Sequence, residues 1–376
     1  MICLVFVGIV LLLTSCVSGM TPVGWSGVAI GNGSIYTGSK EGRLVSFKTS
    51  DGSRMWAETL KDANAGSGSC GLGGSSSGAV GGCGGTASVA IYGTPALSGD
   101  LVYIAGYNGK IYAYNVASLQ PRWVYPREGY LKPIVSAITI SGNFLYFGCS
   151  DYKLYALDLT TGDFKWEFTT GGEIWASPAV DNGIVFITSF DKKVYALDAA
   201  TGSKKWEFAT SATNIAPPLA MDGIVYVGSL DRNFYALNEN DGKLVWKYSA
   251  DNWFWAKPVA YEGIIYAPCM DNRVYGFDTK TGEKVFNYNV EGQVASWPII
   301  VEKRVIVATQ NGKLWSLSTD ASVKDQKLAA TIPEQVTSPL AAIDTTVYVN
   351  GPDNNIRPYN LSTGGSLSPI SIKSQQ

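Results

Sequence analysis

A twelve-residue pattern recurs along the chain at a spacing of about forty residues, which limits the fold to architectures built from repeated units. The clearest copies are YALDLTTGDFKW (155–166), YALDAATGSKKW (195–206), YALNENDGKLVW (235–246) and YGFDTKTGEKVF (275–286). Weaker copies lie at 45–56, 112–123, 315–326 and 357–368. The pattern therefore predicts eight structural units.

A second apolar segment precedes each copy, and an Asp, Asn or Glu separates the two segments. The separating residues are Glu41, Asn108, Asp151, Asp191, Asp231, Asp271, Asn311 and Asp353. An Asp or Asn between two alternating apolar segments is typical of a hairpin turn. Because these residues occur singly, about forty residues apart, we interpret them as turn formers and regard ion binding as the less favoured alternative.

Each repeat has room for four short strands. An apolar strand comes before the hairpin and is opened by a proline in six repeats: Pro95, Pro178, Pro218, Pro258, Pro298 and Pro339. The segment that bears the Trp supplies the fourth strand, and no repeat shows a helical period. One blade of this kind cannot bury both faces, whereas eight blades around an axis can. We predict an all-β fold, an eight-bladed β-propeller of four-stranded antiparallel blades.

The recurring pattern Ala-x-Asp/Asn-x-x-x-Gly-x-x-x-Trp resembles the tryptophan-docking motif of quinoprotein alcohol dehydrogenases and their eight-bladed relatives. Its Gly positions here are Gly162, Gly202 and Gly242, and its Trp positions, including weaker copies, are Trp56, Trp123, Trp166, Trp206 and Trp246. The resemblance implies that each Trp stacks between neighbouring blades and that each Gly makes a turn. Both roles are structural.

Histidine is absent from the chain, which excludes Ser-His-Asp and Cys-His catalysis and His-ligated zinc. The net charge of −2 leaves no basic excess for nucleic acid. Quinoprotein dehydrogenases hold pyrroloquinoline quinone and calcium in the central funnel, above a pair of adjacent cysteines. This chain lacks such a pair and is much shorter, so we expect no catalytic residues, no cofactor and no metal. A quinone-dependent dehydrogenase of reduced size is the alternative.

The N-terminus has the pattern of an export signal. Residues 2–13 form an uncharged apolar run that is too short to span a bilayer. The following Leu13-Thr14-Ser15-Cys16 resembles a bacterial lipobox, which implies removal of residues 1–15 and lipidation of Cys16. An ordinary cleaved signal with an incidental Cys is the alternative. Residues 16–24 would then form a lipidated linker, and residues 25–376 a single propeller.

The remaining cysteines form two groups. Cys70 and Cys83 flank GLGGSSSGAVGG inside a Gly/Ser-rich insertion (62–86) after the first blade. In an exported protein this arrangement favours a disulfide, and two free thiols are the alternative. Cys149 and Cys269 occupy a position where other repeats carry Ser, Gly or Thr, which predicts small buried thiols.

The lipobox, the single eight-bladed propeller and the lack of catalytic equipment resemble the BamB family of the outer-membrane β-barrel assembly machinery. The resemblance implies a non-enzymatic, monomeric scaffold that is lipid-anchored at the cell envelope and docks on an envelope protein complex, with that machinery as the expected partner. The anchor would lie at the periplasmic face of an outer membrane, or at the cell surface in a single-membrane bacterium. A surface module that binds a ligand or carbohydrate is a further alternative.

Five tryptophans lie outside the docking positions and the strands, each shortly before the first strand of a blade: Trp25, Trp175, Trp253, Trp255 and Trp297. In a propeller this segment enters near one rim of the central funnel. We hypothesise that these residues contact a partner, because Trp is favoured at binding hot spots. Packing between the inner strands is the alternative.

Overall fold

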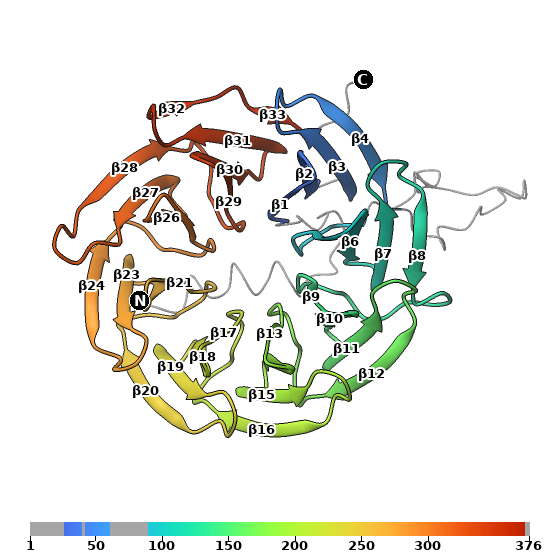
Figure 1. Ribbon diagram of the computed structural model, residues 1–376, viewed down its shortest axis with the longest axis horizontal. Helices are drawn as coiled ribbons and strands as arrows, with labels where there is room; N and C mark the ends of the chain where they lie inside the picture. Colours follow the sequence, from blue (N-terminus) through green and yellow to red (C-terminus); the bar gives the residue numbers. More distant parts are fainter. Residues whose placement is uncertain (1–25, 40–41, 61–88, 373–376) are drawn as a thin grey trace, which may run out of the picture.

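The computed structural model describes residues 26–39, 42–60 and 89–372. Eight antiparallel sheets follow one another around a central axis as the blades of a propeller (Figure 1). The predicted eight-bladed, all-β architecture is confirmed. Within the described ranges no helix is long and apolar enough to cross a membrane.

Each blade is a meander whose strands run outward from the axis in chain order. The innermost strands are β1 (Val28–Gly31), β5 (Ala96–Ser98), β9 (Thr139–Ser141), β13 (Ala179–Asp181), β17 (Leu219–Met221), β21 (Val259–Tyr261), β25 (Ile299–Val301) and β29 (Ala341–Ile343). The second strands are β2 (Ser34–Gly38), β6 (Leu101–Gly106), β10 (Phe144–Gly148), β14 (Ile184–Thr188), β18 (Ile224–Gly228), β22 (Ile264–Cys269), β26 (Arg304–Ala308) and β30 (Thr346–Asn350).

The third strands are β3 (Arg43–Lys48), β7 (Lys110–Asn115), β11 (Lys153–Asp158), β15 (Lys193–Asp198), β19 (Asn233–Asn238), β23 (Arg273–Asp278), β27 (Lys313–Ser318) and β31 (Asn355–Asn360). The outermost strands are β4 (Arg54–Thr59), β8 (Pro121–Tyr125), β12 (Phe164–Thr169), β16 (Lys204–Ala209), β20 (Leu244–Ser249), β24 (Lys284–Asn289) and β28 (Gln326–Thr331). In the eighth blade two short strands, β32 (Gly365–Ser366) and β33 (Ile370–Ser371), both pair with β31.

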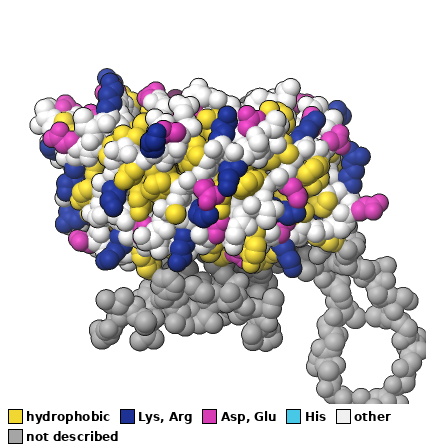
Figure 2. All heavy atoms as spheres, turned by 90° about the horizontal axis from the view of Figure 1, so that it is seen from below, with side chains coloured by type: hydrophobic (Ala, Val, Ile, Leu, Met, Phe, Trp, Pro, Cys, Tyr) yellow, Lys and Arg dark blue, Asp and Glu magenta, His cyan; other side chains and the backbone are white. Residues whose placement is uncertain are grey.

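Burial follows the position of a strand in its blade. The second strand of the fourth blade, β14, is buried along its whole length because neighbouring blades cover both of its faces. The outermost strand of the same blade, β16, has exposed charged residues on either side of the buried Trp206. Figure 2 shows the resulting side wall, where charges of both signs lie between apolar side chains. Charged side chains on an outer strand protect the sheet edge from pairing with other chains.

The Asp between the second and third strands organises the hairpin turn. In the fourth blade Asp191 Oδ1 accepts a hydrogen bond from the Lys193 amide at 3.0 Å, and its Oδ2 accepts one from the Tyr195 hydroxyl at 2.6 Å. The third and fifth blades repeat both bonds at Asp151 and Asp231. These bonds use both carboxylate oxygens within the turn, as the turn-former interpretation requires.

The docking tryptophans join each blade to the next. The indole of Trp166 donates to the Ala199 carbonyl at 3.1 Å, and its ring lies against Gly202 of the following blade. The Tyr146 hydroxyl donates to the same carbonyl at 2.9 Å. Four other tryptophans donate to the matching carbonyl of the next blade: Trp56, Trp123, Trp206 and Trp246. Gly162 and Gly242, in their left-handed turns, lie against Trp123 and Trp206.

Among the described strands, the first and last blades each consist of consecutive strands, and side-chain contacts join the two blades. The Asn350 side chain donates to the Ser26 carbonyl at 2.8 Å and to Thr37 Oγ1 at 3.0 Å. One apolar cluster spans this junction and consists of Val28, Ile35, Val45, Phe47, Tyr348, Ile356 and Ile372. Side-chain packing and these hydrogen bonds therefore hold the two ends of the described propeller together.

Candidate binding site in the central funnel

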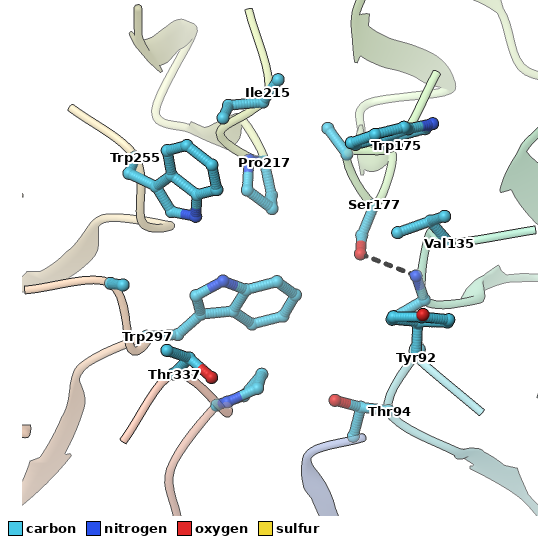
Figure 3. A pocket seen from close by; sticks show the side chains of 15 residues that line it. Tyr92, Thr94, Val135, Trp175, Ser177, Ile215, Pro217, Trp255, Trp297 and Thr337 are labelled. Carbon is cyan, nitrogen blue, oxygen red and sulfur yellow. Dashed lines mark hydrogen bonds between the residues drawn. The ribbon is translucent and has the colours of Figure 1, made fainter. Parts of the chain in front are cut away.

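The connectors between blades bring two rings of side chains to the axis, just before the innermost strands. The first ring consists of Tyr92, Val135, Trp175, Ile215, Trp255, Ala295 and Thr337, and the second of Thr94, Ala137, Ser177, Pro217, Trp297 and Pro339. Together they line a cavity of about 130 Å³ (Figure 3). In seven blades the residue between the two rings lies at a bend of the connector, between the two residues that line the funnel.

The residue between the two rings is small in every described blade. The set is Ser26, Gly93, Ser136, Ala176, Ala216, Ala256, Ser296 and Ser338. These residues are buried, and several serines bond to the second strand of their own blade. The Ser136 hydroxyl donates to the Gly148 carbonyl at 3.1 Å and accepts from the Gly148 amide at 2.9 Å. Such bonds fix the connector, so that its flanking residues face the funnel.

A second cavity, of about 370 Å³, lies beside the fifth, sixth and seventh blades. It is lined by Leu219, Met221, Lys257, Pro258, Val259, Ala260, Trp297, Pro298, Ile299 and Leu340. Trp297 lines both cavities, so they adjoin at this side chain. The described lining is therefore mainly apolar, with one charged residue and four aromatic ones: Tyr92, Trp175, Trp255 and Trp297.

The structure brings three of the five proposed partner-binding tryptophans together at the first cavity, namely Trp175, Trp255 and Trp297. Trp25 lies outside the described residues. Trp253 does not line the cavity, and its carbonyl accepts a hydrogen bond from the Met270 amide at 2.9 Å.

The three cavity tryptophans differ in their surroundings. The Trp175 ring lies 4.5 Å from the Phe190 ring, centroid to centroid, and its indole donates to the Ser150 hydroxyl at 3.1 Å. Trp255 has no hydrogen bond or ring stacking with any described residue, and its indole lies toward Pro217 in Figure 3. Trp175 thus has a packing role, whereas Trp255 is a half-buried residue of the cavity lining.

Sequence reasoning missed Lys257, which lies at the second-ring position of the sixth blade. The described residues at this position in other blades are uncharged, so a lysine at that register was the available signal. Its ammonium lies 5.9 Å from the centroid of the Trp297 ring. Burial lowers the pKa of Lys257, because the apolar surroundings disfavour the charged form.

Cys149 and Cys269 are both buried free thiols. The Cys149 thiol donates to the Lys132 carbonyl at 3.3 Å, and Cys269 donates to the Asn252 carbonyl at 3.4 Å. Burial raises the pKa of both thiols well above the usual range. The other cysteines of the sequence analysis, Cys16, Cys70 and Cys83, lie outside the described residues.

The described residues that line the funnel include few titratable side chains. Tyr92 and Lys257 are the titratable side chains among its described lining residues, and burial raises the pKa of Tyr92 to about 12. Across the described part of the chain, no three His, Cys, Asp or Glu side chains are grouped so as to hold a metal ion.

A family profile described as outer membrane protein assembly factor BamB matches residues 17–173, 168–253 and 253–376. The chain belongs to the BamB family. The BamB of Alteromonas naphthalenivorans is 26% identical to it over 109 residues, which are 25% of this chain and 26% of that protein. This match therefore spans about a quarter of the length of the curated relative.

Solved structures resemble the propeller over most of its length. The crystal structure of BamB from Moraxella catarrhalis has a TM-score of 0.64 at 21% identity, with 74% of this chain and 85% of that chain covered. The computationally designed Ika8 protein has a TM-score of 0.70 at 13% identity, with coverages of 89% and 96%. At these identities the likeness to the structures concerns the fold alone.

Proposed function

We propose that this chain is a non-enzymatic scaffold of the cell envelope that works in outer-membrane protein assembly. In this proposal it contacts its partner through the funnel residues Trp175, Trp255 and Trp297. The BamB family match across residues 17–376 carries the proposal. Membership of that family supports an association with the β-barrel assembly machinery. The place of Trp255 in the cavity lining supports the choice of surface, because Trp is enriched at binding hot spots.

The proposal includes a lipid anchor. Residues 1–15 act as the signal, Cys16 carries the lipid, residues 16–24 form the linker and residues 25–376 form one monomeric propeller. Several acyl chains on one residue give stable membrane attachment. Labelling cells with a radioactive fatty acid tests this part. The wild-type chain is labelled, whereas Cys16→Ser is not, and label on the Ser variant contradicts the anchor.

Capture of the partner tests the scaffold role. The full-length chain is purified from detergent-solubilised membranes with its associated proteins, in parallel with Trp255→Ala and Phe164→Ala. Phe164 is the matched control, because its side chain is 48% exposed on the outermost strand of the third blade, far from the funnel in the fold. Wild type and Phe164→Ala recover a β-barrel assembly protein, whereas Trp255→Ala recovers much less. Equal recovery by all three chains contradicts the funnel as the contact surface.

A dehydrogenase of reduced size is the enzymatic alternative. A quinone cofactor with calcium needs carboxylate ligands, and the described residues that line the funnel contain none. This lining supports the scaffold proposal. Addition of pyrroloquinoline quinone and calcium to the purified chain, followed by a dye-linked alcohol assay, tests the alternative directly. Turnover above that of the cofactor alone contradicts the non-enzymatic role.

A further inference from the structure

Lys257 is an uncompensated positive charge at the centre of the propeller. Among the described residues that line the two cavities, it is the only charged one. Its ammonium forms neither a hydrogen bond nor an ion pair with the described part of the chain. Within the described ranges, the ring of Trp297 lies 5.9 Å from this ammonium and gives it a cation–π contact.

An unpaired ammonium in apolar surroundings is unfavourable, which is why buried lysines are normally paired. A cation–π contact at this distance offsets only part of that cost. An anion bound beside Lys257 restores the missing interaction. Lys257 is half-buried, and other blades carry the uncharged Ser177, Pro217 and Pro339 at the same register.

We propose that the cavity beside Lys257 binds an apolar ligand through a single carboxylate. The carboxylate pairs with the Lys257 ammonium, and the apolar body lies against Trp297, Leu219 and Met221, which line the same cavity. A single carboxylate fits better than a phosphate, because the described lining residues include one cation and no second basic side chain. A dianion would leave a net negative charge in an apolar site.

The carboxylate can come from a free amphipathic acid or from the carboxyl end of a peptide. Both sources present the same chemistry to Lys257. This inference shares the funnel with the proposed scaffold role but does not depend on it, since small soluble probes test it without any envelope partner. Failure of ligand binding therefore leaves the capture experiment on Trp255 unaffected.

Calorimetric titration of the purified chain tests the inference with two matched pairs of probes. Octanoate and octanamide represent a free acid, and N-acetyl-Leu-Phe and its C-terminal amide represent a peptide end. At least one acid should bind about tenfold or more tightly than its amide, and the pair that shows this preference identifies the source. Equal affinity within both pairs, or no binding of any probe, overturns the proposal.

Two variants test whether Lys257 causes the preference for the acid over the amide. Lys257→Met keeps the length and apolar stem of the side chain and should bind acid and amide equally. Lys192→Met removes an exposed lysine from a hairpin turn of the fourth blade and should behave as wild type. A Lys257→Met chain that keeps the full preference for the acid overturns the assignment.

A second measurement does not depend on the folding of the variant. In the wild-type chain, affinity for the acid should fall as Lys257 loses its proton at alkaline pH, while affinity for the amide stays constant. Because burial lowers the pKa of Lys257, the fall begins below the usual lysine range. Parallel pH profiles for acid and amide overturn the proposal.

Discussion

Gly202 lies so close to Trp166 of the preceding blade that a methyl group on its α-carbon would be 2.5 Å from Cε3 of the indole. The glycine also has a positive φ of 73°. One position thus meets two requirements: the left-handed turn between third and fourth strands, and a flat surface for the docking tryptophan. The same pairing joins Gly162 to Trp123 and Gly242 to Trp206.

The first prediction separates these two requirements. Gly202→Ala should destabilise the chain both by backbone strain, about 1–2 kcal/mol, and by overpacking against Trp166, about 1–3 kcal/mol. Gly183→Ala is the matched control in the same blade, because its φ is 74° and no atom lies within 4 Å of the added methyl group. Urea unfolding should show the smaller, strain-only loss for Gly183→Ala. Equal losses would mean that the indole contact is unimportant.

A second prediction concerns the tyrosine that shares the docking carbonyl. In the fifth blade the Tyr226 hydroxyl donates to the Thr279 carbonyl at 3.2 Å, beside the Trp246 indole at 3.3 Å. In the sixth blade the equivalent Tyr266 hydroxyl is buried, with no hydrogen-bond partner in the described residues. Tyr226→Phe should therefore lower the free energy of unfolding by about 1 kcal/mol, whereas Tyr266→Phe should leave it unchanged or raise it.

Denaturant unfolding of the two variants measures this difference directly. The two substitutions remove the same atom from matching positions, so that the hydrogen bond is the main variable. A loss of stability in Tyr266→Phe as large as in Tyr226→Phe would contradict the assignment of an unsatisfied hydroxyl.

The repeat explains why much of the fold could be predicted from the sequence. Asp191, Gly202 and Trp206 recur in register in neighbouring repeats, so each local signal is reinforced several times. The predicted hairpin Asp residues accordingly lie in turns, and the docking tryptophans lie between blades. The outer strand of the eighth blade is divided into β32 and β33, and here the motif is a weaker copy with Ser368 in place of the docking Trp.

The funnel was less predictable, because its residues lie in connectors that lack the repeat motif. Sequence spacing placed Trp175 and Trp255 in one register but could not show that Trp175 packs on Phe190, since that contact depends on side-chain direction. The surroundings of the Lys257 ammonium are set by neighbouring blades, which place the Trp297 ring beside it. Such features arise from tertiary packing rather than from local pattern.

A third prediction follows from the buried thiols. The Ser189 hydroxyl donates to the Gly172 carbonyl at 3.2 Å, and the Cys149 and Cys269 thiols bond to carbonyls at the matching place in their blades. Because burial also raises the pKa of both thiols, they should not react with a thiol reagent in the native chain at pH 8. Reaction should begin only with unfolding. Rapid labelling of wild type that is lost in Cys149→Ser or Cys269→Ser would contradict this prediction.

The last prediction concerns Glu239, whose side chain is 1% exposed between the fourth and fifth blades. The Asn182 amide donates to one carboxylate oxygen at 3.3 Å, and the other oxygen has no hydrogen-bond partner in the described residues. Burial raises the pKa of Glu239, the nearby Asp181 carboxylate raises it further, and the Asn182 hydrogen bond opposes both effects. The charged form is thus less favourable in the folded chain than in the unfolded one.

The sign of the pH dependence follows from this shift. As the pH rises above the unfolded pKa of about 4.3, the unfolded chain loses the Glu239 proton before the folded chain does. The contribution of Glu239 to the free energy of unfolding therefore falls until the pH passes its folded pKa. Glu239→Gln is permanently neutral and escapes this loss. The variant should therefore match wild type near pH 4 and exceed it in free energy of unfolding at pH 7, as measured by urea denaturation. A variant less stable than wild type at pH 7 would show that the charged carboxylate stabilises this interface.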